Sequence, residues 1–185
     1  MALTLWLVRH TPVLAAPGLC YGASDLPTDA QATQAAARAL LPQLPAGVVV
    51  RSSPLQRCER LAQAARALQP DLTYKIDPRL REMDFGAWEG QPWDAIPRAD
   101  FEAWTNDFAH ARPGHHGETV TEVMQRVASA WDEARARRGD TLWVTHGGVM
   151  RAALLLSRGT RQVHRAADWP RDALGFGEVL RLPLD

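Results

Sequence analysis

The amino-acid sequence predicts an α/β protein in which a mostly parallel sheet lies between two layers of helices, a three-layer α/β/α arrangement. Two observations support this fold class. Short apolar runs alternate along the chain with amphipathic stretches of helical length. The first run, residues 3–8, is apolar on both faces, as in a parallel strand that helices cover on either side. We expect one domain over residues 1–185, because no repeat, linker or low-complexity segment interrupts the pattern.

The remaining strands are predicted where other short apolar runs stand between turn residues. They are expected at residues 47–50, 72–76 and 141–145, with one edge strand at residues 178–182.

Three of the predicted helices begin at an N-terminal signal. Residues 28–31 have the form of a capping box, Ser53 stands before a proline at the first helical position, and Thr119 opens a second capping box. A fourth helix is predicted over residues 149–157. The segment 84–117 is rich in Trp, Pro and Gly, and we expect short helices and loops there.

The overall charge argues against two classes of partner. The 21 basic and 21 acidic residues cancel, whereas general binding to nucleic acid or to a membrane surface favours a basic excess. We therefore expect no nucleic-acid and no membrane partner. The apolar start, residues 1–8, is too short for a signal peptide or a membrane span. Cys20 and Cys58 lack a metal-binding spacing, and we expect reduced thiols in a cytoplasmic protein.

Polar residues follow three of the predicted strands at the point where each strand ends. Arg9 and His10 follow the first strand, and Arg57 lies in the first helical turn after the second. His146 and Gly147 follow the strand at residues 141–145. In open α/β sheets the ligand crevice lies beyond the carboxyl ends of the strands. If these strands are neighbours, two arginines and two histidines surround one crevice.

This set of side chains suits a phosphoryl group. Guanidinium groups match phosphate oxygens and neutralise their charge, and backbone N–H groups at Gly147 and the helix start behind it hold an anion. Neutral imidazole is a good nucleophile near physiological pH. We expect one histidine to carry the phosphoryl group and the other, protonated, to stabilise the transferring charge.

A departing alkoxide also needs a proton. Glu82 and Asp84 are the two candidate donors in the segment 80–86. A carboxyl group beside a bound phosphate dianion is kept protonated near neutrality by the like charge, so it is able to act as an acid. The chemistry of the two residues does not rank one above the other.

Four segments, taken in chain order, resemble the signature blocks of the histidine phosphatase superfamily, which has the phosphoglycerate mutase-like fold. They are residues 7–11, 52–57, 82–90 and 144–148. An Arg-His-Thr tripeptide alone would be a weak signal, but four blocks in the family's order are specific. The resemblance covers the chain from about residue 3 to residue 157.

The resemblance implies a role for each residue of the set. His10 takes the position of the nucleophile, and Glu82 takes that of the proton donor, which ranks it above Asp84. The phosphate-binding positions, which also belong to the catalytic set, are taken by Arg9, Arg57 and His146.

Further contacts follow from the same resemblance. The Gly147 N–H looks like another phosphate contact, and we expect Thr11, Tyr21 and Ser24 to contact the substrate. The family uses no metal and no organic cofactor. The expected partner is therefore a small-molecule phosphomonoester substrate.

Residues 18–27 are most like the α-ribazole phosphatase branch, which serves cobalamin synthesis, so α-ribazole 5′-phosphate is an expected substrate. Many members have Gly after the nucleophilic histidine, where this chain has Thr11. The related mutases carry Ser and Asn shortly afterwards, and the loop 12–17 has neither. The segment between Glu82 and His146 is also short for a phosphoglycerate mutase. These departures favour hydrolysis over mutase chemistry.

Two alternatives stay open. One is a phosphoglycerate mutase or a sugar-bisphosphate phosphatase of the same superfamily. The other is a phosphate-binding module without catalysis, against which the proton donor Glu82 argues, because a binder has no need of an acid. His110, His115 and His116 lack a ligand pattern for a metal site and are interpreted as loop residues.

Overall fold

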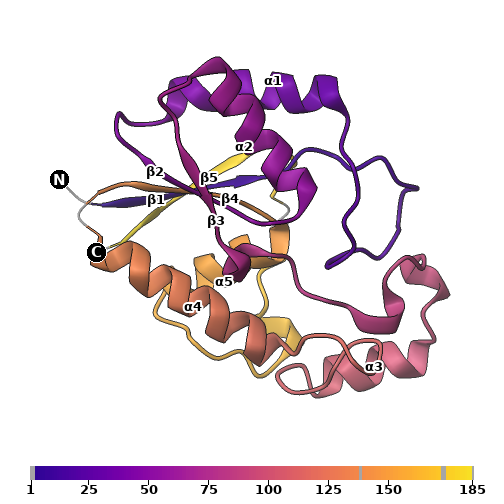
Figure 1. The fold of residues 1–185 in the computed structure, drawn as a ribbon. Helices are drawn as coiled ribbons and strands as arrows, with labels where there is room; N and C mark the ends of the chain where they lie inside the picture. Colours follow the sequence, from indigo (N-terminus) through magenta and orange to yellow (C-terminus); the bar gives the residue numbers. More distant parts are fainter. Residues whose placement is uncertain (1–2, 138, 172–173, 185) are drawn as a thin grey trace.

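The computed structural model describes residues 3–137, 139–171 and 174–184, and its strands and helices lie close to the predicted ones (Figure 1). The strands are β1 (Thr4–Arg9), β2 (Val49–Ser52), β3 (Tyr74–Ile76), β4 (Thr141–Thr145) and β5 (Val179–Pro183). The α-helices are α1 (Ala30–Leu40), α2 (Gln56–Leu68), α3 (Arg98–Asn106), α4 (Val120–Ala136) and α5 (Gly147–Ser157).

The five strands form one sheet in the order β3-β2-β4-β1-β5. The pairs β1–β4, β2–β4 and β2–β3 are parallel, and β5 pairs antiparallel with β1 at the edge. The predicted α/β class and the mostly parallel sheet are therefore confirmed. The register sets Arg9 opposite Thr145 and Ser52 opposite Val144, so the carboxyl ends of β1, β4 and β2 are neighbours, as the candidate site requires.

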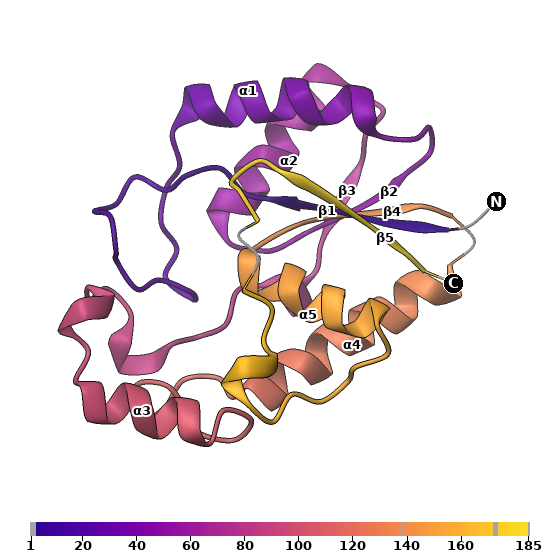
Figure 2. The ribbon, with the colours of Figure 1, turned by 180° about the vertical axis from the view of Figure 1, so that it is seen from behind.

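Helices cover both faces of the sheet. Figures 1 and 2 show α1 and α2 on one face and α4 and α5 on the other. The strand β1 explains why the predicted first run is apolar throughout: Leu5 and Leu7 pack in the cluster with α4 and α5, while Trp6 and Val8 pack in the cluster with α1 and α2. Each of these four side chains is buried, so both faces of the strand contribute hydrophobic free energy to folding.

Two of the three predicted helix starts need correction. The N-cap of α1 is Asp29, whose carboxylate accepts from Ala32 N at 2.7 Å, one residue beyond the predicted Thr28 cap. The helix α2 begins at Gln56, and its N-cap is Leu55, so Ser53 is not the cap. The Ser53 hydroxyl accepts from Leu55 N at 3.3 Å and also lies 2.7 Å from His146 Nε2, so it joins the turn before the helix to the candidate site.

The segment 84–117 contains short 3-10 helices and α3, as expected, and is held by aromatic packing. Trp88 and Trp104 meet edge to face at 5.7 Å between ring centroids, and Phe85 packs edge to face on Trp93 at 5.1 Å. Figure 1 shows this segment and the loop after β1 at the end of the sheet away from the two termini. These two loops therefore flank the carboxyl ends of the strands.

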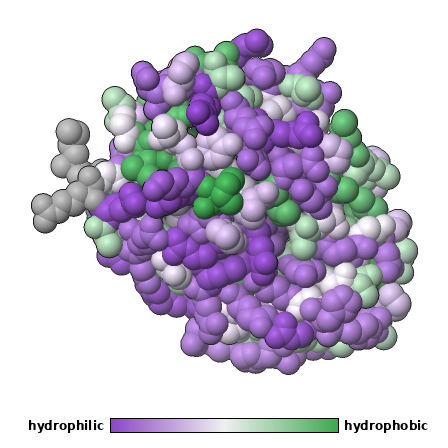
Figure 3. Space-filling model, viewed as in Figure 1, coloured by the Kyte–Doolittle hydropathy of each residue, from purple (hydrophilic) through white to green (hydrophobic). Residues whose placement is uncertain are grey.

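Figure 3 shows one face of the molecule, on which hydrophobic residues lie in small groups among hydrophilic ones. No helix in the described ranges is both long enough and apolar enough to cross a membrane.

The third predicted helix start is confirmed and gives a stability test. Thr119 Oγ1 accepts from Glu122 N at 3.1 Å, and Glu122 Oε2 accepts from Thr119 N at 2.8 Å, which is a complete capping box on α4. We expect Thr119→Ala to lower the free energy of unfolding by about 1 kcal/mol in urea denaturation, because the Glu122 N–H loses its acceptor. Thr73→Ala, at an exposed site outside the helices, is the control. Equal midpoints for both variants would contradict the expectation.

Candidate active site

The four predicted arginine and histidine side chains do come together at the carboxyl ends of the strands. Backbone bonds hold the strand ends in line: His10 N donates to Thr145 O, and Ser53 N donates to Val144 O, each at 3.0 Å. The rings of His10 and His146 lie 5.1 Å apart between centroids. Both histidines and Arg57 are buried.

His10 is held as a neutral imidazole with its reactive nitrogen bare. Its Nδ1 lies 2.7 Å from the carbonyl oxygen of Thr11. A carbonyl only accepts, so Nδ1 carries the proton and Nε2 keeps its lone pair. Burial lowers the pKa of His10 to about 3, and the charges of Arg57 and Arg9 act in the same direction. The side chain is thus neutral at physiological pH, as a histidine nucleophile would need to be.

Arg57 is completely buried, and its guanidinium group donates to three acceptors. Nη2 donates to Gly22 O at 2.6 Å and Nη1 donates to Ser24 O at 2.7 Å. Nε donates to His146 Nδ1 at 3.2 Å. The first turn of α2 therefore places a cation beside His146, and the loop after β1 fixes its orientation.

His146 is also neutral, which differs from the protonated form expected from the sequence. Because Nδ1 accepts from Arg57, the ring proton sits on Nε2, where it donates to Ser53 Oγ at 2.7 Å. Burial lowers the pKa of His146 well below its usual value, with Arg57 as the next cause. The thiol of Cys58 lies 3.3 Å from His146 Nε2. Burial raises the pKa of this thiol, so the thiol stays protonated.

Arg9 is held by a segment that sequence reasoning did not include. Its Nη1 donates to Leu174 O at 2.6 Å, and its Cζ lies 3.9 Å from the ring centroid of Phe176. The same ring stands 5.4 Å from His10. Arg9 Nε is buried and has no hydrogen-bond partner within the described part of the chain. Such an unpaired buried donor suits an anion as its partner.

Glu82 stands at the start of α5, beside the phosphate-binding groups. Its Oε2 accepts from Gly148 N, and its Oε1 accepts from Met83 N, each at 3.0 Å. Asp84 accepts from Gly86 N at 2.8 Å and closes a turn. Glu82 therefore lies next to the candidate phosphate site, whereas Asp84 closes a local turn, and the role of Glu82 as proton donor stays a prediction.

Arg151 is a site residue that the sequence analysis missed. A Cβ on Gly147 would lie 3.4 Å from Arg151 Nη1 and 3.7 Å from Arg9 Cζ, so both guanidinium groups flank the start of α5. Arg151 Nε is buried without a hydrogen-bond partner among the described residues. The sequence could have indicated Arg151, because residue 151 lies one helical turn after Gly147 and on the same face of the predicted helix.

The three further predicted contacts lie near the site, but their side chains already have partners in the protein. Thr11 Oγ1 is 2.9 Å from Thr33 Oγ1, and the Ser24 hydroxyl donates to the Glu89 carboxylate. Tyr21 places its ring 5.3 Å from Arg57 Cζ. Direct contact of these three residues with substrate stays a prediction.

A cavity of about 390 Å³ opens beside Glu82 and is lined by Gly148 and Arg151 as well. Most of its wall is aromatic or aliphatic, and the aromatic members are Phe85, Phe101, Trp104, Phe108 and Trp169. An acid at the edge of an apolar cavity is the arrangement that a leaving group with a flat or apolar part would fit.

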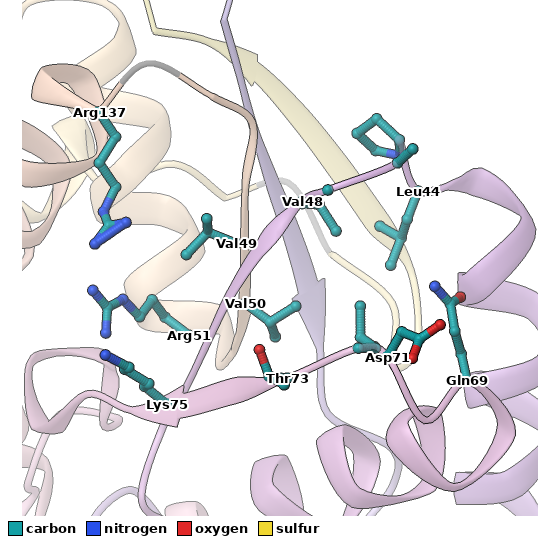
Figure 4. Close-up of a pocket in the computed structure, with 14 residues that line it drawn as sticks. Leu44, Val48, Val49, Val50, Arg51, Gln69, Asp71, Thr73, Lys75 and Arg137 are labelled. Carbon is teal, nitrogen blue, oxygen red and sulfur yellow. The ribbon is translucent and has the colours of Figure 1, made fainter.

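A second cavity, of about 650 Å³, surrounds the amino ends of β2 and β3, at the other end of the sheet. Figure 4 shows Arg51, Lys75 and Arg137 on one side of it. Arg51 and Arg137 approach the carboxylate of Glu133 at 3.1 and 3.8 Å, so part of this charge is balanced. No histidine lines this cavity, and we therefore place the candidate site at the carboxyl ends.

The loop histidines His110, His115 and His116 do not join the site residues. In the described ranges no three His, Cys, Asp or Glu side chains gather in the way that a metal ion requires.

Comparison with known proteins identifies the family. Residues 5–173 match the histidine phosphatase superfamily (branch 1). The chain belongs to the histidine phosphatase superfamily. The resemblance of the four signature blocks is thereby confirmed, and the match extends beyond them to almost the whole chain.

Individual proteins are similar to this chain over most of their length. The adenosylcobalamin/alpha-ribazole phosphatase of Escherichia coli (strain K12) is 32% identical over 162 residues, which make up 83% of this chain and 77% of that protein. The structure of TTHB049 from Thermus thermophilus matches with a TM-score of 0.72 at 30% identity, over 97% of this chain and 92% of that one. A mycobacterial glucosyl-3-phosphoglycerate phosphatase shares the fold, with a TM-score of 0.79 at 24% identity over 98% and 90%.

Gly148 offers a test of the proton donor in this histidine phosphatase. A Cβ at this position would lie 2.2 Å from Glu82 Oε1, so Gly148→Ala must displace the carboxylate. We expect turnover of glycerol 2-phosphate, whose alkoxide needs a proton, to fall about 100-fold, within the range of general acid catalysis. Turnover of p-nitrophenyl phosphate, a better leaving group, should fall less.

The matched control is Gly139→Ala, because nothing lies within 4 Å of a Cβ there. Equal losses of Gly148→Ala on the two substrates would contradict the role of Glu82 as acid.

Proposed function

We propose that this chain is a phosphomonoesterase that carries the phosphoryl group on His10. The observation that supports this most is the bare Nε2 of His10, oriented by the Thr11 carbonyl and surrounded by Arg9, Arg57 and His146. The nitrogen is a nucleophile without prior deprotonation, and the cations beside it balance the charge of a phosphoryl group.

The reaction proceeds in two displacements. In the first, Nε2 of His10 attacks phosphorus, the ester P–O bond breaks, and Glu82 gives its proton to the leaving oxygen. In the second, water attacks the phosphohistidine, Glu82 takes a proton from that water, and the P–N bond breaks to release inorganic phosphate. Glu82 and His10 return to their starting states, so protons balance over the cycle.

The surrounding groups act on the phosphoryl oxygens in both steps. The guanidinium groups of Arg9 and Arg57 and the N–H of Gly147 bind them. A phosphoryl dianion beside His146 raises the pKa of that ring and favours its cationic form, which the neighbouring arginines otherwise oppose. The proposal uses neither a metal nor an organic cofactor.

We propose α-ribazole 5′-phosphate, from cobalamin synthesis, as the substrate to test first. The similarity to the Escherichia coli phosphatase supports it. The cavity next to Glu82 supports it as well, because its aromatic wall suits the flat base of that leaving group.

The nucleophile is tested by His10→Ala. We expect this variant to keep its fold by circular dichroism and to lose turnover of p-nitrophenyl phosphate, because Nε2 is removed. Brief incubation with ³²P-labelled substrate and a denaturing quench should leave label on the wild type as an acid-labile, base-stable adduct, and none on the variant. His110→Ala is the histidine control. EDTA should not change the rate.

Three results would count against this proposal. Full turnover by His10→Ala would exclude the nucleophile, and loss of activity with EDTA would indicate a metal enzyme. No turnover by the wild type across a broad panel of phosphomonoesters would favour a non-catalytic binding module.

Arg151 favours a second candidate within the same chemistry, a sugar-bisphosphate phosphatase or a phosphoglycerate mutase. Arg151 lines the cavity beside Glu82, and its buried Nε has no hydrogen-bond partner among the described residues, so its guanidinium group would bind a second acidic group on the leaving group. Incubation with 3-phosphoglycerate and a trace of the bisphosphate distinguishes the mutase, which forms the isomer, from a phosphatase, which releases only phosphate.

The prediction for this second candidate compares phenyl phosphate with 2-carboxyphenyl phosphate. If Arg151 binds an acidic leaving group, Arg151→Met should lower kcat/KM about tenfold or more for the carboxylated ester, as expected for one lost charged hydrogen bond, and change phenyl phosphate little. Arg161→Met, which removes an exposed arginine paired with Asp132, is the control. An equal effect on both esters excludes this role.

A further inference from the structure

We propose that Glu89 is a positioning residue for phosphoryl binding, which holds Arg57 in place through the loop of residues 22–24. The inference rests on the proposed function, because it assigns a task to a residue that serves the phosphate site. Glu89 itself lies behind the loop and does not face His10. It acts on the phosphoryl group only through Arg57.

Three consecutive backbone N–H groups converge on the Glu89 carboxylate. Oε1 accepts from Gly22 N and Ala23 N at 3.0 Å, and Oε2 accepts from Ser24 N at 3.1 Å. The Ser24 hydroxyl donates to Oε2 as well. Residues 22–24 form bends and belong to no strand or helix. The Glu89 carboxylate therefore accepts the hydrogen bonds that their backbone N–H groups would otherwise donate within secondary structure.

The opposite side of the same loop holds Arg57. Its guanidinium donates to the carbonyls of Gly22 and Ser24. The Gly22 carbonyl and the Ala23 N–H are the two ends of one peptide unit. A single peptide dipole thus stands between the carboxylate of Glu89 and the guanidinium of Arg57, with each end facing the charge that it favours. Hydrogen bonds in such a chain polarise and strengthen one another.

The charge of Glu89 matters because Arg57 lacks an acid of its own. No carboxylate forms an ion pair with this buried cation in the described part of the chain. Burial opposes ionisation of Glu89, yet its hydrogen bonds to Ser24, Gly22, Phe85 and Ala23 outweigh burial and lower its pKa. The carboxylate is therefore ionised at neutral pH.

The loop of residues 22–24 packs against the segment that carries Glu82, and Glu89 joins the two. A Cβ on Gly22 would lie 1.8 Å from Met83 O, so the loop backbone packs directly on the block that carries the acid Glu82. Phe85 N donates to the same Oε1 of Glu89 at 3.0 Å. Glu89 therefore joins the loop that orients Arg57 to the segment that carries the proton donor.

Glu89→Gln tests the inference, because the amide keeps the size of the side chain and removes its charge. We expect the dissociation constant for inorganic phosphate, measured by calorimetry, to rise about tenfold or more, and kcat/KM for p-nitrophenyl phosphate to fall by a similar factor. Glu102→Gln, an acid removed from the exposed face of α3, is the control and should match the wild type.

A leaving-group comparison separates positioning of Arg57 from loss of the acid step. For Glu89→Gln the ratio of kcat/KM between p-nitrophenyl phosphate and glycerol 2-phosphate should equal that of the wild type, because Glu82 is untouched. A shift of this ratio toward that of Glu82→Gln would overturn the inference. Wild-type phosphate affinity in a folded Glu89→Gln would overturn it as well.

Ser24→Ala serves if Glu89→Gln fails to fold. It removes one hydrogen bond to Glu89 and leaves the carbonyl that holds Arg57, so a smaller loss of phosphate affinity in the same direction is expected, and an unchanged affinity contradicts the inference. Phosphate binding is measured without turnover. If the wild type hydrolyses no phosphomonoester, the proposed function is wrong. The phosphate-binding measurement still decides the role of Glu89 in that case.

Discussion

The structure of the site depends on a positive charge that is buried without an ion-pair partner among the residues that the structure describes. The guanidinium of Arg57 has no exposure, and its hydrogen-bond partners are two carbonyls and an imidazole nitrogen, all formally neutral. Burying a cation costs free energy unless its N–H donors have acceptors and its charge is balanced. Here the donors are satisfied by protein groups, and the positive charge that remains favours the anion that the proposed function requires.

The two histidines have opposite tautomers, and in each the group that Nδ1 meets decides which one. His10 meets a carbonyl at Nδ1 and must donate there, which leaves Nε2 free to attack. His146 meets a guanidinium at Nδ1 and must accept there, which places its proton on Nε2. Burial and Arg57 keep both rings neutral. One fixed cation thus supports a nucleophile on one side and a hydrogen-bond donor on the other.

How far the sequence predicts this arrangement depends on the range of the interactions involved. The apolar run of β1 and the capping box at Thr119 are local, and the structure confirms both. The cap predicted at Ser53 is wrong, and the contact of this hydroxyl with His146, 93 positions away, is one that no local pattern predicts. Phe176 and Glu89 were missed for the same reason, since each reaches the site only through contacts that no local spacing encodes.

The start of helix α5 lies beside both parts of the candidate site, the proposed phosphate-binding groups and the proposed proton donor. Its first residue, Gly147, lies beside Arg9 at the phosphate end, and its second, Gly148, donates to Glu82 at the mouth of the aromatic cavity. The positive end of one helix dipole therefore faces both the proposed phosphoryl site and the Glu82 carboxylate. Because both lie at the same helix start, the backbone of α5 fixes the position of the proposed proton donor relative to the proposed phosphate site.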